Sequence, residues 1–431
     1  MTLPGDPDIA YRGDALFIEE VSLSDLAVRF GTPLYVYSCA AMARALALYQ
    51  GALAGRDHLI CYAMKANSNL AVLQWFARQG CGFDIVSSGE LDRALAAGAM
   101  ASRIVFSGVG KTRDEMRRAL DAGVLCFNVE SAAELELLSS VAVAMGRTAA
   151  VSLRVNPDVD ANTHPYISTG LKSNKFGIAH VDTLAVYRHA ATLPGIAVAG
   201  IDCHIGSQIT EVAPYVAALD RLLDLVEAAG QIGIEIGHVD LGGGLGIAYG
   251  DTPSLSADVL VARLLGRIDE RGHAHRKIIV EPGRSLVGHA GVLVSEVLSI
   301  KPVDAKTFCI VDAAMNDLLR PALYDAWMRI VECQRNGAAA VQRLDVVGPI
   351  CESGDWLGRD RDLRVRPGDH VAILSAGAYA MSMASNYNSR GRAAEVMVSG
   401  NSVWLVRDRE TSADQMRGEH LLPDRERPQG F

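Results

Sequence analysis

The sequence predicts a (β/α)8 barrel joined to a second, β-rich domain, and two observations carry that prediction. Between His58 and Gly283, eight short apolar runs alternate with amphipathic stretches, a pattern typical of parallel βαβ units. Polar residues stand at or just past the ends of these runs, which an eight-stranded barrel would bring to one rim. A doubly wound open sheet is the competing interpretation, because counting strands cannot prove closure. The polar residues at the strand ends favour the barrel.

Strands and helices are expected to alternate along this segment. The strands are expected at Leu59–Met64, Phe83–Val86, Ile104–Ser107, Leu125–Val129, Ala150–Val155, Val198–His204, His238–Leu241 and Lys277–Glu281. The helices are expected at Glu90–Gly98, Arg113–Gly123, Ser131–Met145, Pro214–Ala229 and Leu255–Arg271. The polar rim consists of Lys65, Asp84, Ser87, Asn128, Asn156, His204, Gly242–Gly244 and Glu281–Arg284.

After Arg284 the pattern changes to that of a β-rich domain. Only Pro321–Val331 is expected to be helical there, and the sequence leaves open whether the strand-like runs Leu16–Val21 and Leu34–Tyr37 join this domain. The expected divisions are a barrel over residues 33–283, a β-rich domain of residues 1–32 with 284–407, and a charged, loosely ordered tail over residues 408–431. The expected strands are Val292–Val303, Phe308–Val311, Arg343–Val347, His370–Leu374, Ala394–Val398 and Val403–Val406.

Composition and charge argue against several classes of protein. The 431 residues include 50 acidic and 41 basic ones, an excess of negative charge that disfavours nucleic-acid binding. No apolar run is long enough for a membrane span, and the first residues lack the pattern of a secretory signal. The eight cysteines form no CxxC pair, and several stand in apolar runs, as reduced core cysteines do. A cytoplasmic protein without nucleic-acid or membrane partners is expected.

The stretch CYAMKANSN, residues 61–69, places Lys65 at the end of the first apolar run. A lysine there could extend to solvent, pair with a carboxylate or act as a desolvated amine nucleophile. A nucleophile needs a neutral amine, and burial at a strand end is expected to lower the pKa of Lys65 for that purpose.

Other strand ends offer groups that could hold an anionic, ring-containing ligand. The run DLGGGLGI, residues 240–247, follows the seventh strand, where barrels commonly bind phosphate, although a flexible turn is the plain alternative. Glu281 could reach a cationic ring nitrogen or form an ion pair with Arg284 that closes the rim. His204 could stack on a planar ligand or be purely structural, and Ser207 could donate to a phosphate.

Together these groups match the needs of pyridoxal 5′-phosphate: a lysine for a Schiff base, a phosphate site, a stacking imidazole and a carboxylate for the ring nitrogen. Such a cofactor serves as an electron sink for a carbanion at the α-carbon of an amino acid. Lys65 is therefore interpreted as the Schiff-base lysine, and no metal is expected.

The sequence also resembles the diaminopimelate decarboxylases, within the alanine racemase-like, fold type III group of pyridoxal-phosphate enzymes. The resemblance extends from Gly31 to Arg407 and leaves out the charged tail. The motifs that carry it are Tyr62-Ala-Met-Lys-Ala-Asn67, Asn156-Pro-Asp-Val-Asp160, His164-Pro-Tyr-Ile-Ser-Thr-Gly170, Lys175-Phe-Gly177, His204-Ile-Gly-Ser207, Gly242-Gly-Gly244, Glu281-Pro-Gly-Arg284, Cys351-Glu-Ser-Gly354 and Gly377-Ala-Tyr379.

The resemblance implies a role for each site residue. Lys65 would hold the cofactor, His204 would stack on its ring, and Glu281 would keep the pyridine nitrogen protonated. Cys351 would protonate the substrate carbanion after CO2 leaves. The phosphate would be held by Ser207, Gly243, Gly244, the backbone from Glu281 through Gly283 to Arg284, and Tyr379. The unreactive end of the substrate would be bound by Arg284, Arg320, Tyr324, Glu352 and Tyr379.

Two of these assignments have support from the sequence itself. Cys351 stands in the polar, glycine-rich stretch Gly348–Asp355, which is unlike the surroundings of an inert core cysteine. Arg320 and Tyr324 are four residues apart on the predicted helix, so they would share one face. The resemblance further implies a homodimer with shared active sites, in which each subunit supplies Cys351 and Glu352 to its neighbour.

The expected reaction is decarboxylation of meso-2,6-diaminopimelate at its D-centre to give L-lysine and CO2, the last step of lysine biosynthesis. The alternative is a decarboxylase of ornithine, arginine or lysine, but the pair Arg284 and Arg320 favours a substrate with a distal carboxylate. A racemase is less expected, because Glu281 promotes a full electron sink. A catalytically dead relative that binds a protein is a further alternative, against which Lys65, Glu281 and Cys351 count.

Overall fold

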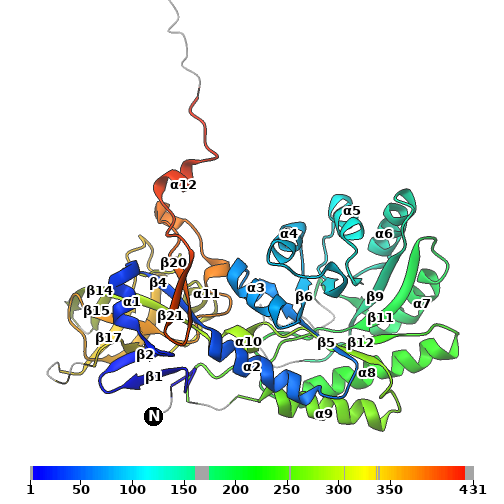
Figure 1. The fold of residues 1–431 in the computed structure, drawn as a ribbon, viewed down its shortest axis with the longest axis horizontal. Helices are drawn as coiled ribbons and strands as arrows, with labels where there is room; N and C mark the ends of the chain where they lie inside the picture. The colour runs from blue at the N-terminus through cyan, green and yellow to red at the C-terminus, as the bar shows by residue number, and fades with distance from the viewer. Residues whose placement is uncertain are drawn as a thin grey trace, which may run out of the picture.

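The computed structural model describes residues 3–160, 174–251, 254–304, 306–335, 337 and 340–422. A parallel barrel occupies one side of the molecule and a β-rich part the other, and the C-terminal segment extends away from both (Figure 1). One continuous cluster of buried side chains includes Phe83 of the barrel and Leu293 of the second sheet, so the two parts share a core.

Eight parallel strands form the barrel, and they follow one another in chain order. The first strand pairs with the last, with Ile278 opposite His58, so the sheet closes on itself. Closure confirms the predicted (β/α)8 barrel and excludes the open sheet. The strands are β5 (His58–Ala63), β6 (Gly82–Ile85), β7 (Ile104–Phe106), β8 (Cys126–Val129), β9 (Ala149–Asn156), β11 (Ile196–Asp202), β12 (His238–Asp240) and β13 (Lys277–Val280).

Five of the helices around the barrel, those from α2 to α6, begin at residues whose side chains cap them. Ser87 accepts a hydrogen bond from the backbone of Glu90, and Thr112 and Glu115 form a reciprocal capping box. These caps fix where each chain segment turns back from a strand end. The helices are α2 (Cys39–Ala52), α3 (Leu70–Arg78), α4 (Ser88–Ala96), α5 (Arg113–Ala122), α6 (Ala132–Ala144), α7 (His180–Ala190), α8 (Ala213–Gln231), α9 (Ala257–Glu270) and α10 (Arg284–Val287), with short elements η1 (Met64–Ala66), η2 (Ala101–Arg103) and β10 (Ile178–Ala179). In the described part of the chain, no helix has the length and apolar character needed to cross a bilayer.

The β-rich part is built on a long sheet with the strand order β18-β17-β15-β14-β4-β20-β21, to which β19 and β16 add through β14. Strand β4 belongs to this sheet, because it pairs with both β14 and β20. The expected limits of the domains stay predictions. The strands are β4 (Leu34–Ser38), β14 (Gly291–Val303), β15 (Lys306–Val311), β16 (Ile330–Glu332), β17 (Gln342–Val347), β18 (Trp356–Leu363), β19 (His370–Ile373), β20 (Ala394–Ser399) and β21 (Ser402–Arg407). A separate small sheet and a helix come first, as β1 (Ile9–Arg12), β2 (Ala15–Ile18), β3 (Val21–Ser22) and α1 (Leu23–Phe30), and two single turns follow β19, as η4 (Met381–Met383) and η5 (Tyr387–Ser389).

The predicted helix Pro321–Val331 is wrong over most of its length. The structure has only α11 (Arg320–Tyr324), which ends where Asp325 takes a left-handed conformation with φ of 50°. The chain then forms β16, whose Ile330 pairs with Ile373 of β19. Pairing with a distant strand overrides the local helical pattern here, as it commonly does for short apolar runs.

The first part of the predicted loose tail also differs from expectation. Residues 412–416 form α12 (Ser412–Met416), which Thr411 and Asp414 cap reciprocally. Glu410 accepts a hydrogen bond from the Arg392 backbone at 2.9 Å and pairs with the Arg392 guanidinium at 3.2 Å. These contacts hold the start of the segment against the β-rich part, and residues 423–431 lie outside the described chain.

Candidate active site

The site lies at the carboxyl ends of the barrel strands, where Lys65 of η1 meets Asp84 of β6. The Lys65 Nζ donates to the Asp84 Oδ2 at 2.6 Å, and the Asp84 side chain is fully buried while that of Lys65 is 35% exposed. These residues meet because β5 and β6 are neighbouring parallel strands, with Ala63 opposite Asp84. The sequence placed Asp84 on the rim but did not identify it as the partner of the lysine.

The electrostatics of Lys65 differ from the expectation. Burial lowers the pKa of its ammonium, but the Asp84 carboxylate, the Tyr379 hydroxyl and the Glu281 carboxylate raise it further, and the net pKa lies above the ordinary value. The prediction that burial lowers the pKa of Lys65 is therefore wrong: the net shift is upward. The cause is that a fully buried carboxylate contacts the amine directly.

His204 follows β11 and faces the glycine loop. Its Nδ1 accepts a hydrogen bond from the Gly243 backbone at 3.2 Å, which leaves the ring in a neutral form. Burial is the main reason that the pKa of His204 lies well below the ordinary value, and the positive charges of Lys65 and Arg154 add to it. A neutral, oriented imidazole at this height can stack on a planar ligand.

The glycines after β12 are required by close backbone approaches. A Cβ on Gly243 would lie 2.1 Å from the Glu281 carbonyl oxygen, and one on Gly244 would lie 2.3 Å from that of Gly206. Gly244 also has φ of +99°, which L side chains rarely adopt. The turn therefore exposes backbone to the rim without side chains in the way, as a phosphate site needs.

Arg284 and Arg320, which we call the arginine pair, both contact Tyr249. Arg284 donates to the Tyr249 hydroxyl at 2.6 Å and to the Ser207 hydroxyl at 2.8 Å. The Arg320 guanidinium carbon lies 5.3 Å from the centre of the Tyr249 ring and 5.5 Å from that of Tyr324. Both arginines are about 95% buried, at 4% and 5% exposure, and among the described residues no carboxylate pairs with either.

Tyr249 is a site residue that the sequence analysis missed. It stands seven residues past Gly242 in the glycine loop, so its distance from the end of β12 hid it from strand-end reasoning. The loop itself is held against the β-rich part, because Arg329 pairs with Asp251 at 2.6 Å and the Trp327 ring packs beside Gly250. Burial is the main reason that the pKa of Arg320 is lowered, and repulsion by the nearby Arg284 charge lowers it further.

The floor of the site is acidic. Asp202, Asp240 and Glu281 are all buried, and one carboxylate oxygen from each lies within 4.8 Å of the others. With the buried Asp84 they form what we call the acidic cluster. Burial is the first cause that raises the pKa of Asp240 to about 7 and that of Glu281 well above its usual range, and mutual repulsion adds to it.

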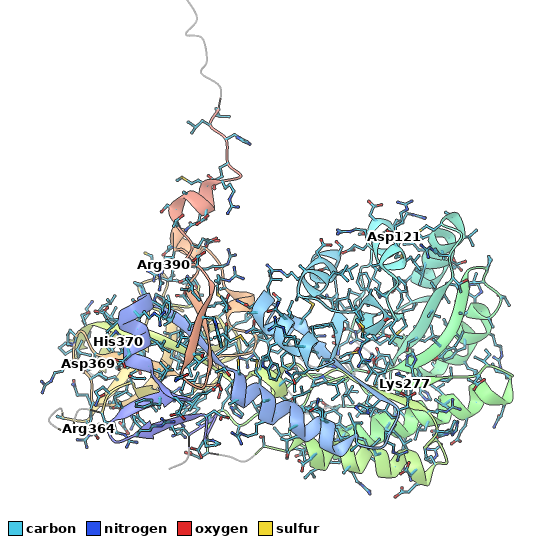
Figure 2. The ribbon with its side chains drawn as sticks, viewed as in Figure 1. Asp121, Lys277, Arg364, Asp369, His370 and Arg390 are labelled. Atoms are coloured by element: carbon cyan, nitrogen blue, oxygen red, sulfur yellow. The ribbon has the colours of Figure 1, made fainter. Side chains whose placement is uncertain are left out.

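The remaining predicted residues divide into two groups. Tyr379 joins the barrel residues, because its backbone donates to the Ala66 carbonyl at 2.8 Å and its ring lies 4.7 Å from the Arg284 guanidinium. Cys351 and Glu352 are exposed and contact Asn388 and Tyr387, on the segment that also carries the Arg390 labelled in Figure 2. The described chain thus does not bring Cys351 to Lys65. The motif at residues 164–170 lies outside the described residues.

The described residues fit pyridoxal 5′-phosphate. Lys65 offers the amine, Glu281 a carboxyl for the ring nitrogen, and the glycine turn beside Ser207 a phosphate site. The Tyr215 hydroxyl is buried beside Gly244 and has no hydrogen-bond partner in the described chain, as expected of a group that awaits an anion.

Comparisons with known proteins agree with this fit. The family described as "Pyridoxal-dependent decarboxylase, pyridoxal binding domain" matches residues 39–288. The chain is 58% identical to the diaminopimelate decarboxylase of Pseudomonas aeruginosa, over 96% of this chain and 99% of that protein. It is 54% identical to that of Neisseria meningitidis serogroup A, over 94% and 98%.

Solved structures of diaminopimelate decarboxylases in complex with L-lysine are also similar. The one from M. jannaschii has a TM-score of 0.93 at 38% identity, with 98% of this chain and 99% of that chain covered. The one from Helicobacter pylori has a TM-score of 0.88 at 39% identity, with 91% and 98% covered. The chain belongs to the diaminopimelate decarboxylase family of pyridoxal-dependent decarboxylases.

Proposed function

We propose that the chain decarboxylates meso-2,6-diaminopimelate at its D-centre, giving L-lysine and CO2, with pyridoxal 5′-phosphate as its cofactor. The observation that carries the choice of substrate is the arginine pair, two buried guanidinium groups without a carboxylate partner in the described chain. A buried arginine stays charged and is costly when unpaired, so the site is complementary to a ligand carboxylate. Diaminopimelate supplies one at its unreactive end, and ornithine, arginine and lysine do not.

When bound, the cofactor would supply an electron sink for the α-carbon of the substrate. Lys65 would anchor the cofactor, and His204, whose Nδ1 accepts from the Gly243 backbone, would stack on its ring. Glu281 would accept a hydrogen bond from the ring nitrogen. Arg284 and Arg320 orient the substrate from its distal carboxylate, with Tyr249 fixing the two guanidinium groups relative to each other.

The proton that replaces CO2 is assigned to Cys351 of a second subunit. Cys351 is the most exposed of the eight cysteines, none of which is in a disulfide, and residues 351–353 of its loop are all exposed. We therefore infer a homodimer in which Cys351 and Glu352 complete the neighbouring site. The free thiols also support a reducing compartment, and we place the activity in the cytoplasm.

The substrate proposal is tested by measuring CO2 and L-lysine with the loaded enzyme and a panel of amino acids. Meso-diaminopimelate should give equimolar CO2 and L-lysine, while ornithine, arginine and lysine should react far more slowly. A higher kcat/KM for ornithine or lysine would replace the proposal with the basic amino acid alternative.

The shared site is tested by mixing inactive Lys65→Ala with inactive Cys351→Ala subunits. If each site needs residues from both chains, a mixed dimer has one site with both residues intact, and up to about half of the sites in each mixed dimer become active. No recovery after demonstrated subunit exchange would mean that Cys351 acts within its own chain or has no catalytic role.

A further inference from the structure

The acidic cluster holds more carboxyl groups than the described cations can neutralise. Asp202 ends β11, Asp240 ends β12 and Glu281 follows β13, so three neighbouring strands deliver a carboxyl each to one point. Their exposures are 1%, 0% and 5%, and their oxygens lie within 4.8 Å of one another. Like charges this close and this dry cannot all ionise.

The nearby cations are already engaged elsewhere. Lys65 pairs with Asp84 at 2.6 Å. Arg154 pairs with Glu130 at 2.7 Å and lies 4.0 Å from Asp202. Within the described chain no lysine or arginine forms a salt bridge with Asp240 or Glu281. A proton bound by one of these two carboxyls removes the repulsion between their negative charges.

A carboxyl oxygen of Asp240 lies within 4.8 Å of one of Glu281. Two buried carboxyl groups this close can join by a hydrogen bond only when one of them is protonated, because an ionised carboxylate has no hydrogen to donate. The other contacts of the two are acceptor contacts: Asp240 Oδ1 accepts from the Gly242 backbone at 2.9 Å, and Glu281 Oε1 accepts from Asn128 Nδ2 at 3.4 Å. The Asp240 Oδ2 is buried and has no hydrogen-bond partner in the described chain, so it is free to face the neighbouring carboxyl.

We propose that Asp240 and Glu281 share a single proton, and that Asp240 is a positioning residue that sets the charge of Glu281. If the proposed function holds, Glu281 must be the anion that accepts from a protonated ring nitrogen. The shared proton then resides on Asp240, having moved between the two adjacent carboxyls, and no other proton donor or acceptor is needed. Asp240 would touch neither the cofactor nor the substrate.

The groups that surround the pair leave few competitors for this titration. Burial raises the pKa of the thiols of Cys61 and Cys126 on adjacent strands well above their usual value, and also that of Cys203, so the thiols remain neutral. The pKa values of Lys65 and Arg154 are raised too, which keeps both charged. Two further carboxyls lie close to the pair: Asp84 is engaged by Lys65 at 2.6 Å, and the pKa of Asp202 is raised by burial and by Asp240.

The test is the pH dependence of unfolding for the full-length chain without cofactor or substrate. Because the folded pKa of Asp240, about 7, exceeds its ordinary 3.8, the native state retains a proton that the unfolded chain has lost. The free energy of unfolding should therefore fall as pH rises from about 4 to about 7. Asp240→Asn should reduce this dependence by about one proton, because its amide can donate to Glu281 without titrating and its oxygen can still accept from Gly242.

The decisive measurement is the double variant. Glu281→Gln removes the same proton, so Asp240→Asn with Glu281→Gln should reduce the number of linked protons no further than either change alone. Asp317→Asn is the matched control, because Asp317 is a buried acid of the other half of the molecule, with a pKa raised to about 6. Its effect should add to that of Asp240→Asn. Additive effects of Asp240→Asn and Glu281→Gln would overturn the proposal.

A second measurement covers the case in which Asp240→Asn does not fold. In the wild-type chain, Asp and Glu carboxyl carbons labelled with 13C should show Asp240 and Glu281 titrating together, each responding to both steps. Independent single-step titrations of the two would contradict a shared proton. Neither experiment involves substrate, so their outcome is separate from that of the CO2 assay, and either proposal can fail alone.

Discussion

The acidic cluster and the arginine pair lie in one site, yet they solve the problem of buried charge in opposite ways. Asp202, Asp240 and Glu281 can take up a proton, and their raised pKa values indicate that they do. Arg284 and Arg320 have no such escape, because a guanidinium does not lose its proton in a protein. The charge of the acidic cluster is therefore neutralised by protons, whereas the charge of the arginine pair has to be neutralised by a bound ligand. For that reason the arginine pair indicates the substrate, and the acidic cluster indicates how many protons the folded chain holds.

The largest expected effect comes from removing Lys65, the lysine that pairs with Asp84 of the acidic cluster. Lys65→Ala should abolish the visible absorbance of covalently held cofactor and lower turnover roughly a thousandfold or more, as loss of a covalent catalyst does. Absorbance spectra and CO2 release measure the two effects. Lys277→Ala is the control. Lys277 begins β13, at the end of the strand away from Glu281, and pairs with Asp57 at 3.3 Å, so its removal should change neither the absorbance nor the turnover. A Lys65→Ala enzyme with normal turnover would remove Lys65 from the reaction.

The arginine pair is broken by Arg320→Ala. Loss of a charge-assisted contact in a closed site should cost about 2–4 kcal/mol, or roughly 30- to 1000-fold in kcat/KM for diaminopimelate. Any trace activity on lysine or ornithine should suffer far less, since neither has a distal carboxylate, and the cofactor spectrum should be unchanged. Arg343→Ala, an exposed arginine of β17, is the control. Equal losses on all substrates would assign Arg320 a structural role and weaken the comparison of the two regions.

The glycine turn between the two regions gives a smaller effect. Gly244→Ala should lower the free energy of unfolding by about 1–3 kcal/mol, because φ of +99° strains any side chain and the new Cβ would meet the Gly206 carbonyl at 2.3 Å. Cofactor affinity, measured by titration, should fall as well. Gly266→Ala lies in the middle of α9 with no atom within 4 Å of the new Cβ, so it should instead stabilise by about 0.5–1 kcal/mol. If Gly266→Ala destabilised the protein as much as Gly244→Ala, the positive φ and the close backbone approach at Gly244 would not be the cause of the loss.

The smallest expected effect is on the free energy of unfolding of a Glu90→Gln variant. Glu90 is an acid next to the acidic cluster but not part of it. Burial and the Asp84 charge raise the pKa of Glu90 to about 7. The native state thus keeps a proton that the unfolded chain loses, so this contribution to stability declines as pH rises from about 4 to about 7. Glu90→Gln can still accept from the Val86 backbone, and it should match the wild type at pH 4 and exceed it slightly at pH 8. The gain should stay below about 1 kcal/mol because water screens a partly exposed group.

Local patterns in the sequence were sufficient for the barrel. Its eight strands were predicted because each is a short buried run that ends in a polar residue, and a closed sheet repeats that unit eight times. The β-rich part was predicted less well. Strand β18 was missed because its charged residues, such as Arg359 and Arg361, hide the alternation, and β16 was mistaken for helix because its partner β19 is distant in sequence.

For the site, the sequence identified residue types but not their contacts. It placed Lys65, Glu281 and Asp84 on one rim, yet it could not show that Asp84 contacts the lysine amine and thereby reverses the expected pKa shift. Tyr249 went unnoticed because a tyrosine within a loop has no periodic signal. The proposed sharing of a proton between Asp240 and Glu281 depends on the pairing of β12 with β13 in the barrel, which no local pattern encodes.

Closure of the barrel between β5 and β13 has a consequence for how the protein is made. Lys65 leaves the ribosome early, but its neighbour in the sheet, β13, leaves only after residue 280 has been synthesised, and Tyr379 follows later still. No amino-terminal fragment that stops before β13 can contain a complete cofactor site. The cofactor therefore binds a finished fold and stabilises it by mass action, but it cannot guide the nascent chain toward that fold.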